Sequence, residues 1–257
     1  MKKLLHLSVL MTLTASLPLL SSLHAEQNQP LLLSPGSVLT GGATDGGALE
    51  VSVDGKPLSF ENPVILFEQH LPEADFVSAA WKDGSGQLLH QRDVLLVKSG
   101  YCIVVDYLYG SGEHAVVRSF SFPKEGVELG PQSASAKLSD GKKGSSLLIQ
   151  GLDPDSKIDQ DKATGLILLS GSKKSPTPLP TLLATWSGTT APKVESVKAG
   201  NPMVVKLNVT FADGRFDEVG LAWESRPLHL GNPKREFHGW AACFRHGPRG
   251  DSFFEVK

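Results

Sequence analysis

The stretch from His90 to Pro123 reads HQRDVLLVKSGYCIVVDYLYGSGEHAVVRSFSFP and holds the densest apolar alternation in the chain. Two runs rich in β-branched and aromatic residues, 94–97 and 101–107, flank a Gly-containing turn at 98–100, and this pattern predicts a β-hairpin. Both runs are apolar on both faces, which indicates a hairpin lying between two layers. A third strand is expected from about residue 114 to residue 122.

The length of the turn at 98–100 decides which side chains share a face. A three-residue turn places Arg92 opposite Asp106, with His90 on the same face, because side chains alternate with period two. A two-residue turn places Arg92 opposite Tyr107 and moves Asp106 to the other face. We favour the three-residue turn because it pairs Arg92 with a carboxylate, and we interpret that pair as a structural salt bridge rather than a functional one.

The same stretch carries a family resemblance. The pattern H-x-R-x-V-L-x-V-K-x-x-Y-x-x-V-V-D-x-L-x-G-x-G-E-H, from His90 to His114, resembles the start of the C-terminal β-sandwich domain of heparinase II/III-type polysaccharide lyases. A weaker similarity follows at residues 180–183 and 204–217, and together the two cover most of residues 80–225. The resemblance implies an all-β fold with a large antiparallel β-sandwich of the lyase type.

The resemblance also implies a metal site, because the sandwich of some relatives holds a zinc ion. The implied ligands are the His before the Arg, the Asp that closes the second strand and a His on a following strand. His90 and Asp106 match the first two, whereas Ser121 stands where the third is expected and His114 is a substitute in another part of the strand. Zinc takes three or four protein ligands, so two matches leave a zinc site open at His90 and Asp106.

The lyases that the chain resembles carry a helical toroid ahead of the sandwich. The resemblance implies that this toroid supplies the catalytic Tyr, His and Asn residues. Only about 65 residues precede His90 after the leader described next, and their pattern is β-like. We therefore expect a sandwich without that toroid. Such a protein would associate with carbohydrate, or with a separate toroid-bearing lyase, without catalysing a reaction itself.

The amino terminus has the pattern of a secretory signal peptide. Met1-Lys2-Lys3 precedes an apolar run to Leu20 and a small residue at Ala25, the order typical of a cleaved leader. We expect residues 1–25 to be the signal peptide and residues 26–257 to form one β-sandwich domain, secreted or placed in the periplasm or cell envelope. No later segment is long and apolar enough to predict a membrane span.

Composition supports the all-β prediction and excludes one class of partner. The chain has 26 Gly and 17 Pro at turn spacing, and no amphipathic helix is evident, which is typical of a sandwich or barrel. A formal net charge of −2 gives no electrostatic footprint for nucleic acid. The two cysteines, Cys102 and Cys243, are compatible with a disulfide or with free buried thiols.

Local turn signals divide the rest of the chain. Asp54-Gly55 and Asp213-Gly214 each predict a tight hairpin. The Ser, Lys and Gly residues at 130–145 indicate a loop, and the Pro, Lys and Ser residues at 172–180 indicate a linker on the surface.

Ligand-binding candidates come from residue chemistry. Arg92, Arg118 and Arg245 have the guanidinium fork that matches a uronate or sulfate, although a surface salt bridge is the simpler interpretation of each. Among the four tryptophans, which on strands are more often core residues, Trp240 is expected to be the most exposed. His114, beside a Gly-rich turn, completes the binding set of Arg92, His114, Arg118 and Trp240. As acid–base groups, His90, His114, Tyr107 and Tyr109 are candidates, but no catalytic residue is predicted.

Three functions remain open from the sequence. The favoured one is an exported sandwich that binds an acidic polysaccharide, uronate-containing or sulfated, or docks with a toroid-bearing lyase. The second is a polysaccharide lyase that performs β-elimination on the sandwich face around His90, Asp106 and His114. The third is a structural protein of the cell envelope.

Overall fold

The computed structural model describes residues 50–58, 64–82, 89–120, 122, 125–137, 145–231, 235–248 and 250–257. These residues form strands β1 to β18 and no helix, so the all-β prediction is confirmed. Within them, no segment is a helix of the length and apolar character needed to cross a bilayer. The expected signal peptide at residues 1–25, together with Ser121 and Pro123, lies outside the described residues.

The largest element is a central antiparallel sheet of eight strands in the order β3-β4-β5-β6-β13-β10-β9-β8. Its strands are β3 (Val64–His70), β4 (Ala74–Lys82), β5 (Leu89–Val97), β6 (Tyr101–Tyr109), β13 (Thr177–Ser187), β10 (Ser145–Gly151), β9 (Ser133–Lys137) and β8 (Val127–Leu129). The predicted hairpin forms the middle of this sheet as β5 and β6.

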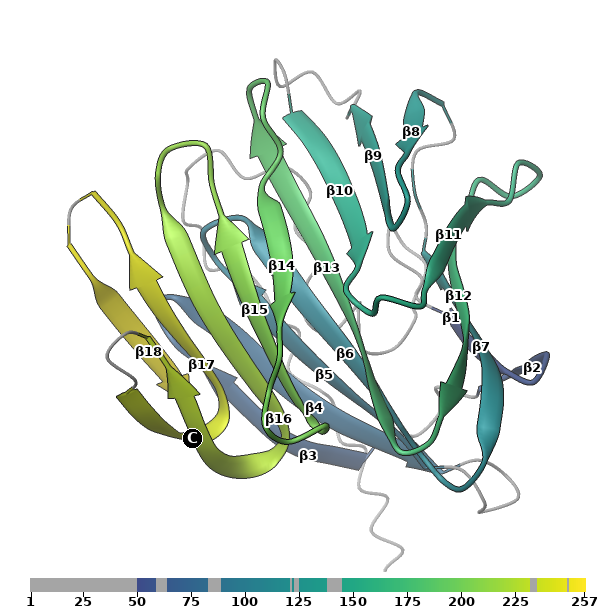
Figure 1. The fold of residues 1–257 in the computed structure, drawn as a ribbon, viewed down its shortest axis with the longest axis horizontal. Helices are drawn as coiled ribbons and strands as arrows, with labels where there is room; N and C mark the ends of the chain where they lie inside the picture. Colours follow the sequence, from purple (N-terminus) through teal and green to yellow (C-terminus); the bar gives the residue numbers. More distant parts are fainter. Residues whose placement is uncertain are drawn as a thin grey trace, which may run out of the picture.

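Two five-stranded antiparallel sheets cover the two faces of the central sheet. The small sheet has the order β11 (Lys157–Gln160), β12 (Ile167–Lys174), β7 (Glu113–Phe120), β1 (Glu50–Val53) and β2 (Lys56–Pro57). The C-terminal sheet has the order β14 (Lys193–Val197), β15 (Val204–Thr210), β16 (Phe216–Leu230), β17 (Arg235–His246) and β18 (Ser252–Val256). In Figure 1 the C-terminal sheet lies on one side of the central strands and the small sheet on the other.

The alternation in the hairpin explains this three-layer stack. Leu95 and Val97 of β5 join one buried cluster with strands of the C-terminal sheet, whereas Val94 and Leu96 join a second cluster with β7 and β12 of the small sheet. We call the two buried layers the C-terminal interface and the small-sheet interface. A strand that is apolar on both faces needs a covering layer on each, so the prediction of a hairpin between two layers is confirmed.

The register of the hairpin is that of the three-residue turn. Val97 pairs with Tyr101 and Arg92 pairs with Asp106. Gly100, at the end of the turn, has a φ of 125°, a region that glycine enters without a steric penalty. The predicted Asp-Gly hairpin at Asp54 and Gly55 is also present, with φ of 51° and 75° at the two residues.

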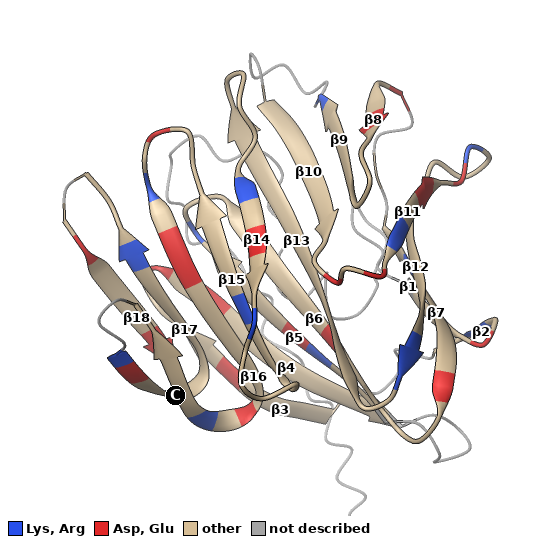
Figure 2. Ribbon diagram, viewed as in Figure 1, with Lys and Arg blue, Asp and Glu red and all other residues tan. Residues whose placement is uncertain are grey.

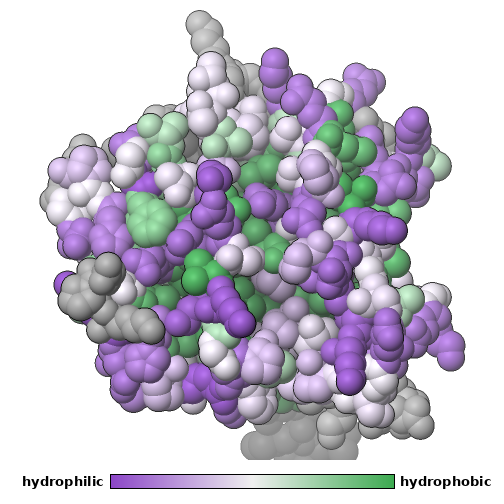
Figure 3. All heavy atoms as spheres, in the orientation of Figure 1, coloured by the Kyte–Doolittle hydropathy of each residue, from purple (hydrophilic) through white to green (hydrophobic). Residues whose placement is uncertain are grey.

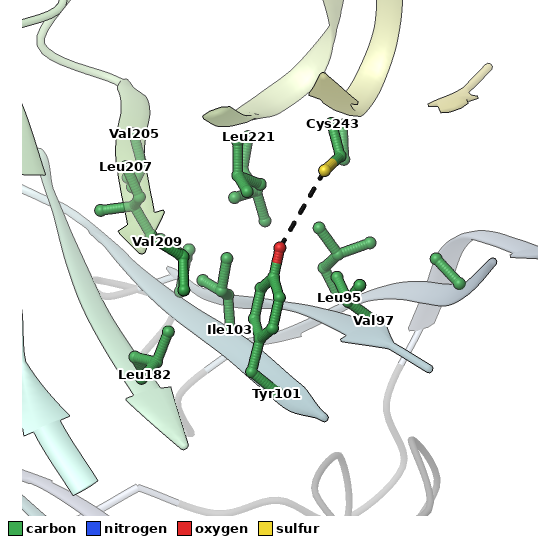
Figure 4. Packing of buried hydrophobic residues seen from close by; sticks show 14 of the residues in the cluster. Leu95, Val97, Tyr101, Ile103, Leu182, Val205, Leu207, Val209, Leu221 and Cys243 are labelled. Atoms are coloured by element: carbon green, nitrogen blue, oxygen red, sulfur yellow. Dashed lines mark hydrogen bonds between the residues drawn. The ribbon is translucent and has the colours of Figure 1, made fainter. Parts of the chain in front are cut away.

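Figure 4 shows part of the C-terminal interface, where Tyr101 of β6 points toward Cys243 of β17 among aliphatic side chains. The Tyr101 hydroxyl lies 4.0 Å from the Cys243 sulfur. Cys102 faces the small-sheet interface instead, so the two cysteines lie on opposite sides of the central sheet and both are free. Burial raises the pKa of each thiol to about 12, which keeps both protonated and unreactive at neutral pH.

Two sequence predictions about loops are wrong. The expected loop at 130–145 contains β9, in which Ala134 and Ala136 are buried and alternate with serines. The expected linker at 172–180 is instead the end of β12 and the start of β13, where Pro178 pairs with Tyr107. In both segments small residues and prolines conceal a period-two pattern that the hydropathy of larger residues would have revealed.

The end of the β16–β17 hairpin folds back over the outer face of the C-terminal sheet. The register of the pair breaks between Leu221 and Arg226. Beyond the break, Leu228 and Leu230 pack with Ala222, Ala242 and neighbouring residues in a separate cluster. A bulge allows a strand to bend in this way, and β16 bends sharply at its lower end in Figure 1.

Candidate functional site

The polar residues at the start of β5 are divided between the two interfaces. The sequence His90-Gln91-Arg92-Asp93 alternates along the strand, so His90 and Arg92 face the small sheet while Gln91 and Asp93 face the C-terminal sheet. The facing part of β6 carries Asp106 on the first side and Tyr107 on the second. One hairpin therefore builds two different polar sites.

The first site, which we call the charged cluster, consists of His90, Arg92, Asp106 and Arg118. Asp106 accepts two hydrogen bonds on one oxygen, since His90 Nε2 lies 2.7 Å and Arg92 Nε lies 2.8 Å from Asp106 Oδ1. The indole of Trp81, on β4, stacks on the His90 ring with 5.3 Å between ring centroids and 22° between planes.

Arg118 enters the charged cluster from β7 of the small sheet. Its Nη1 donates to the Leu179 carbonyl at 2.7 Å and to Thr181 Oγ1 at 2.6 Å, both on β13 of the central sheet. The guanidinium thus links the two layers, and the Asp106 charge acts on it across the interface. Arg118 donates to neutral acceptors, so its charge is balanced at a distance, chiefly by Asp106 and to a smaller extent by Asp153.

Burial is the largest single influence on the pKa of each group in the charged cluster. The exposed fraction is 2% for His90, 0% for Arg92 and Asp106, and 1% for Arg118. Burial alone would raise the pKa of Asp106, but Arg92 and His90 hold it well below its ordinary value. Burial lowers the pKa of His90 despite the hydrogen bond to Asp106. The cluster is therefore a carboxylate between guanidinium groups in a dry interior.

This position corrects the interpretation of Arg92 and Arg118. The expected salt bridge between Arg92 and Asp106 is present, with 2.8 Å between Arg92 Nε and Asp106 Oδ1, but it is buried and not at the surface. Arg118 donates to neutral acceptors and does not form the expected surface salt bridge. The functional alternative for both was binding of a uronate or sulfate. In the structure the two guanidinium groups lie inside the small-sheet interface, so neither can meet a polysaccharide at the surface in this conformation.

The charged cluster does not provide a zinc site as it stands. The two matched ligands, His90 and Asp106, are hydrogen-bonded to each other, and Arg92 donates to the same carboxylate oxygen. A guanidinium beside a ligand oxygen opposes a dication electrostatically. Among the described residues, no three His, Cys, Asp or Glu side chains are placed to hold a metal ion. The donors therefore do not fit zinc, which needs at least three protein ligands.

His114 lies apart from His90 and Asp106, at the start of β7. Its Nδ1 is 2.8 Å from Asp54 Oδ2, in the β1–β2 turn, and its Nε2 is 3.2 Å from the Ser111 carbonyl oxygen. The Asp54 hydrogen bond raises the pKa of His114, against a small opposing effect of burial. The structure thus gives His114 a carboxylate partner of its own at a partly exposed turn.

Trp240 is half-buried at the edge of the C-terminal interface. Its ring stacks on Phe67 of β3, with 5.6 Å between centroids and 9° between planes, and is tilted against Phe76. This contact joins β17 to the edge strand of the central sheet. Part of the indole remains at the surface, so Trp240 stays a binding candidate of limited accessible area.

The second polar site, the Asp93 cluster, consists of Ser78, Gln91, Asp93, Tyr107 and Tyr109 on the central sheet. The Gln91 amide lies 3.0 Å from Asp93 Oδ1 and 3.2 Å from the Ser78 hydroxyl, and it also donates to the Trp223 carbonyl of β16 at 2.9 Å. The Tyr109 hydroxyl donates to Gln91 Oε1 at 3.1 Å. All partners of Asp93 in this cluster are neutral.

The lack of a cation changes the ionisation of Asp93. Burial raises its pKa to about 7, although hydrogen bonds from Gln91 and Ser78 favour the carboxylate. Burial also raises the pKa of Tyr107, and the neighbouring Asp93 and Tyr109 reinforce that effect while Arg226 opposes it. A carboxyl group that titrates near neutral pH is a recognised mark of functional sites.

A third buried carboxylate anchors the turn of the central hairpin. Asp217 of β16 accepts a hydrogen bond from the Tyr101 hydroxyl at 2.9 Å and two from Arg245, at 2.7 Å and 2.6 Å. Arg245 also donates to Ser99 Oγ at 2.9 Å. Arg245, considered as a uronate ligand from the sequence, therefore has its fork occupied by Asp217.

The Asp93 cluster was not predicted as a site from the sequence, although Tyr107 and Tyr109 were named as acid–base candidates. The available signal was the two-sided burial of the hairpin. If both faces of β5 are covered, the polar residues on each face of its first half must be buried as well. That inference applies to Gln91 and Asp93 as much as to His90 and Arg92.

Comparisons with known proteins place the fold among polysaccharide lyases. No protein-family model matches the chain, and no match was found among curated proteins. A mutant of the heparan sulfate lyase HepC from Pedobacter heparinus superposes with a TM-score of 0.56 at 16% identity, over 67% of this chain and 30% of that one. A heparinase III gene product gives a TM-score of 0.51 at 16% identity, over 67% and 29%.

These similarities concern the fold. A heparinase III structure at 12% identity, with a TM-score of 0.50, also matches 67% of this chain and 29% of its own length. The chain thus has the β-sandwich architecture of heparinase III lyases and spans about 30% of their length. The resemblance read from His90 to His114 is confirmed at the level of fold, and function has to be argued from the sites.

Proposed function

We propose that this protein is an exported carbohydrate-associated β-sandwich that binds an acidic polysaccharide and does not cleave it. The observation that carries the proposal is the fold similarity to heparan sulfate lyase over 67% of the chain. Hydrophilic side chains are also spread over the face drawn in Figure 3, among near-neutral and hydrophobic ones, and offer polar contacts to a hydrated ligand.

The charge distribution favours a local binding site over a broad basic surface. In Figure 2, positive and negative residues alternate over the strands of the C-terminal sheet, and the formal net charge of the chain is −2. An anionic polymer would therefore be recognised by particular side chains and not by the overall field.

The placement of the acid–base candidates favours binding over lyase activity. β-Elimination needs a base and an acid near one sugar residue, with a group that stabilises the developing charge. In the described structure His90 lies inside the small-sheet interface, His114 is paired with Asp54 at an exposed turn, and Tyr107 lies in the C-terminal interface. These acid–base candidates, which a lyase would have to bring together at one sugar residue, therefore lie in three different environments.

The test is titration of the full chain with heparan sulfate, hyaluronan, alginate and polygalacturonate oligosaccharides, with a neutral glucan as control. We expect saturable binding of one acidic class and no rise in ultraviolet absorbance from an unsaturated uronate product. A rise in absorbance would establish the lyase alternative.

Failure to bind any acidic oligosaccharide would overturn the proposal of direct binding. Co-purification with a toroid-bearing lyase would then support the docking alternative. If both measurements are negative, the cell-envelope structural role remains.

A further inference from the structure

The Asp93 cluster has hydrogen-bonding groups that the described protein does not use. Four buried polar atoms have no hydrogen-bond partner there: Asp93 Oδ2, Tyr107 Oη, Trp223 Nε1 and Arg226 Nε. A buried donor or acceptor without a partner is destabilising, and native proteins satisfy most of their buried polar groups. Several unused groups in one region therefore call for an explanation.

The four atoms belong to one neighbourhood. Trp223 faces the cluster from the inner side of β16, where its carbonyl accepts from Gln91 and its ring contacts Tyr109 at 5.9 Å between centroids. The charges of Asp93 and Arg226 both act on the Tyr107 hydroxyl, and the Arg226 guanidinium lies 5.5 Å from the Trp223 ring. Together they offer one acceptor, two donors and a hydroxyl that can do either.

The outer wall of this neighbourhood reaches the surface. Tyr109 and Trp223 are half-buried, and the side chains of Arg226 and Glu224 are 21% and 47% exposed. Arg226 Nη2 bonds Glu224 Oε1 at 2.5 Å, a partly exposed pair that a competing carboxylate can replace at small cost. The wall thus combines two aromatic rings with a guanidinium at its rim.

The wall is built on the irregular part of β16. The ladder with β17 breaks between Leu221 and Arg226, so Trp223 and Glu224 lie where the two strands are not in register. Bulges of this kind are frequent beside binding sites, because they redirect side chains and interrupt the pairing that would hold the strand rigid. A ligand can therefore displace the wall without disrupting the rest of the sheet.

The geometry points to a subsite for one uronic-acid residue at the β16 bulge, between Trp223 and the Asp93 cluster. The sugar ring would pack on Trp223 and Tyr109, since aromatic faces suit the C–H surface of a sugar. Its carboxylate would bind Arg226, whose planar fork matches that group. Its hydroxyls, each a donor and an acceptor, would pair with Asp93 Oδ2 and Tyr107 Oη. This inference rests on the proposed function and names where the polysaccharide is held.

The sharpest test is the substitution Tyr107→Phe, which removes one hydroxyl and leaves the ring. Because that hydroxyl has no partner in the described protein, its loss should leave the urea midpoint of unfolding unchanged or slightly higher. The affinity for the acidic oligosaccharide that binds the wild type should fall about 5- to 20-fold. Arg226→Gln should weaken binding at least about 10-fold by removing the charge-assisted contact.

Tyr101→Phe is the matched control in the same interface. Its hydroxyl is bonded to Asp217, away from the bulge, so this variant should lose stability and keep its affinity. If the wild type binds while Tyr107→Phe and Arg226→Gln bind equally well, the subsite is overturned and the proposed function stands. If the wild type binds none of the acidic oligosaccharides named above, both are overturned.

Discussion

Asp106 and Asp93 lie on opposite faces of the same hairpin, and both are fully buried. Asp106 meets two guanidinium groups and an imidazole, which hold its pKa well below the ordinary value against the effect of burial. Asp93 meets an amide and a hydroxyl, and burial raises its pKa to about 7. The two equally buried carboxyl groups thus have pKa shifts in opposite directions, because only Asp106 has cations beside it.

The two carboxylates therefore have different consequences for the protein. In the charged cluster, Arg92, His90 and Arg118 balance the Asp106 carboxylate across the small-sheet interface, and Asp106 Oδ1 accepts two hydrogen bonds, while Asp106 Oδ2 has no hydrogen-bond partner among the described residues. The Asp93 cluster keeps unused hydrogen-bonding capacity behind a half-exposed aromatic wall. A carboxylate with cations beside it is stabilised within the protein, whereas several buried groups without partners in one region call for an explanation such as a bound ligand.

Asp106→Asn should produce the largest effect on stability. The substitution keeps the shape of the side chain but leaves Arg92 buried without its carboxylate partner and removes the larger of the two carboxylate charges that act on Arg118, so we expect a loss of about 3 to 5 kcal/mol in the free energy of unfolding. Urea denaturation at pH 7 measures it. A loss below about 1 kcal/mol would mean that the cluster is hydrated and not the dry interior described above.

Asp217→Asn should have an intermediate effect of about 2 kcal/mol, because it weakens charge-assisted hydrogen bonds to a partly exposed Arg245 and one to Tyr101. Asp217 lies in the same interface as Asp93, but Arg245 is hydrogen-bonded to it. The Asp217→Asn variant therefore shows whether the change in stability depends on burial in that interface or on the cationic partner. If Asp217→Asn instead stabilised the protein, the presence of a cation would not be the deciding difference.

Asp93→Asn should change stability in the opposite direction, and only as the pH rises. A carboxyl whose pKa rises from 3.8 to about 7 on folding contributes stability below pH 3.8 that is lost as the pH approaches 7, because the folded state holds a proton that the unfolded state releases. The Asn variant has no such loss. Its advantage over the wild type should grow by about 2 kcal/mol between pH 5 and pH 8.

Thermal unfolding of wild type and Asp93→Asn across this pH range measures the difference. Asp106→Asn serves as the control, since Asp106 is ionised throughout and its effect should not change between pH 5 and pH 8. A constant difference between wild type and Asp93→Asn would show that Asp93 is ionised in the folded protein at pH 5.

The smallest expected changes in stability come from removing the hydroxyl group of each buried tyrosine of β6. Tyr101→Phe should cost about 1 kcal/mol because it removes a hydrogen bond to a carboxylate, and Tyr107→Phe should change the free energy of unfolding by less than about 0.5 kcal/mol. Urea titrations of both variants decide the point. An equal loss in the two would mean that the Tyr107 hydroxyl has a partner in the free protein.

Much of the fold follows from the sequence because its determinants are local. The register of β5 and β6 depends on the turn at Lys98-Ser99-Gly100, and the pairing of Arg92 with Asp106 follows from it. The prediction that a layer covers each face of the hairpin follows from its two strands, which carry apolar side chains on both faces. β9 and the start of β13 escaped prediction, because small residues and prolines bury too little area for alternation to be recognised.

The sites are less predictable, since they depend on what the covering layers contribute. The sequence placed His90, Arg92 and Asp106 on one face, but their complete burial depends on β7 and β12, which are distant in the chain. Trp223 and Arg226 approach Gln91 and Tyr107 of the Asp93 cluster where β16 breaks its register opposite the start of β5. No local pattern in the sequence indicates that meeting.

The most direct test of the uronate subsite is a ¹H–¹⁵N NMR titration of the tryptophan indoles with the acidic oligosaccharide that binds in solution. Single Trp→Phe variants assign the four indole signals. We expect the Trp223 signal to shift saturably, because Nε1 gains a hydrogen-bond partner, while the signal of Trp81 in the small-sheet interface does not move. A saturable shift confined to Trp240, or binding with no shift of Trp223, would contradict the site at the β16 bulge.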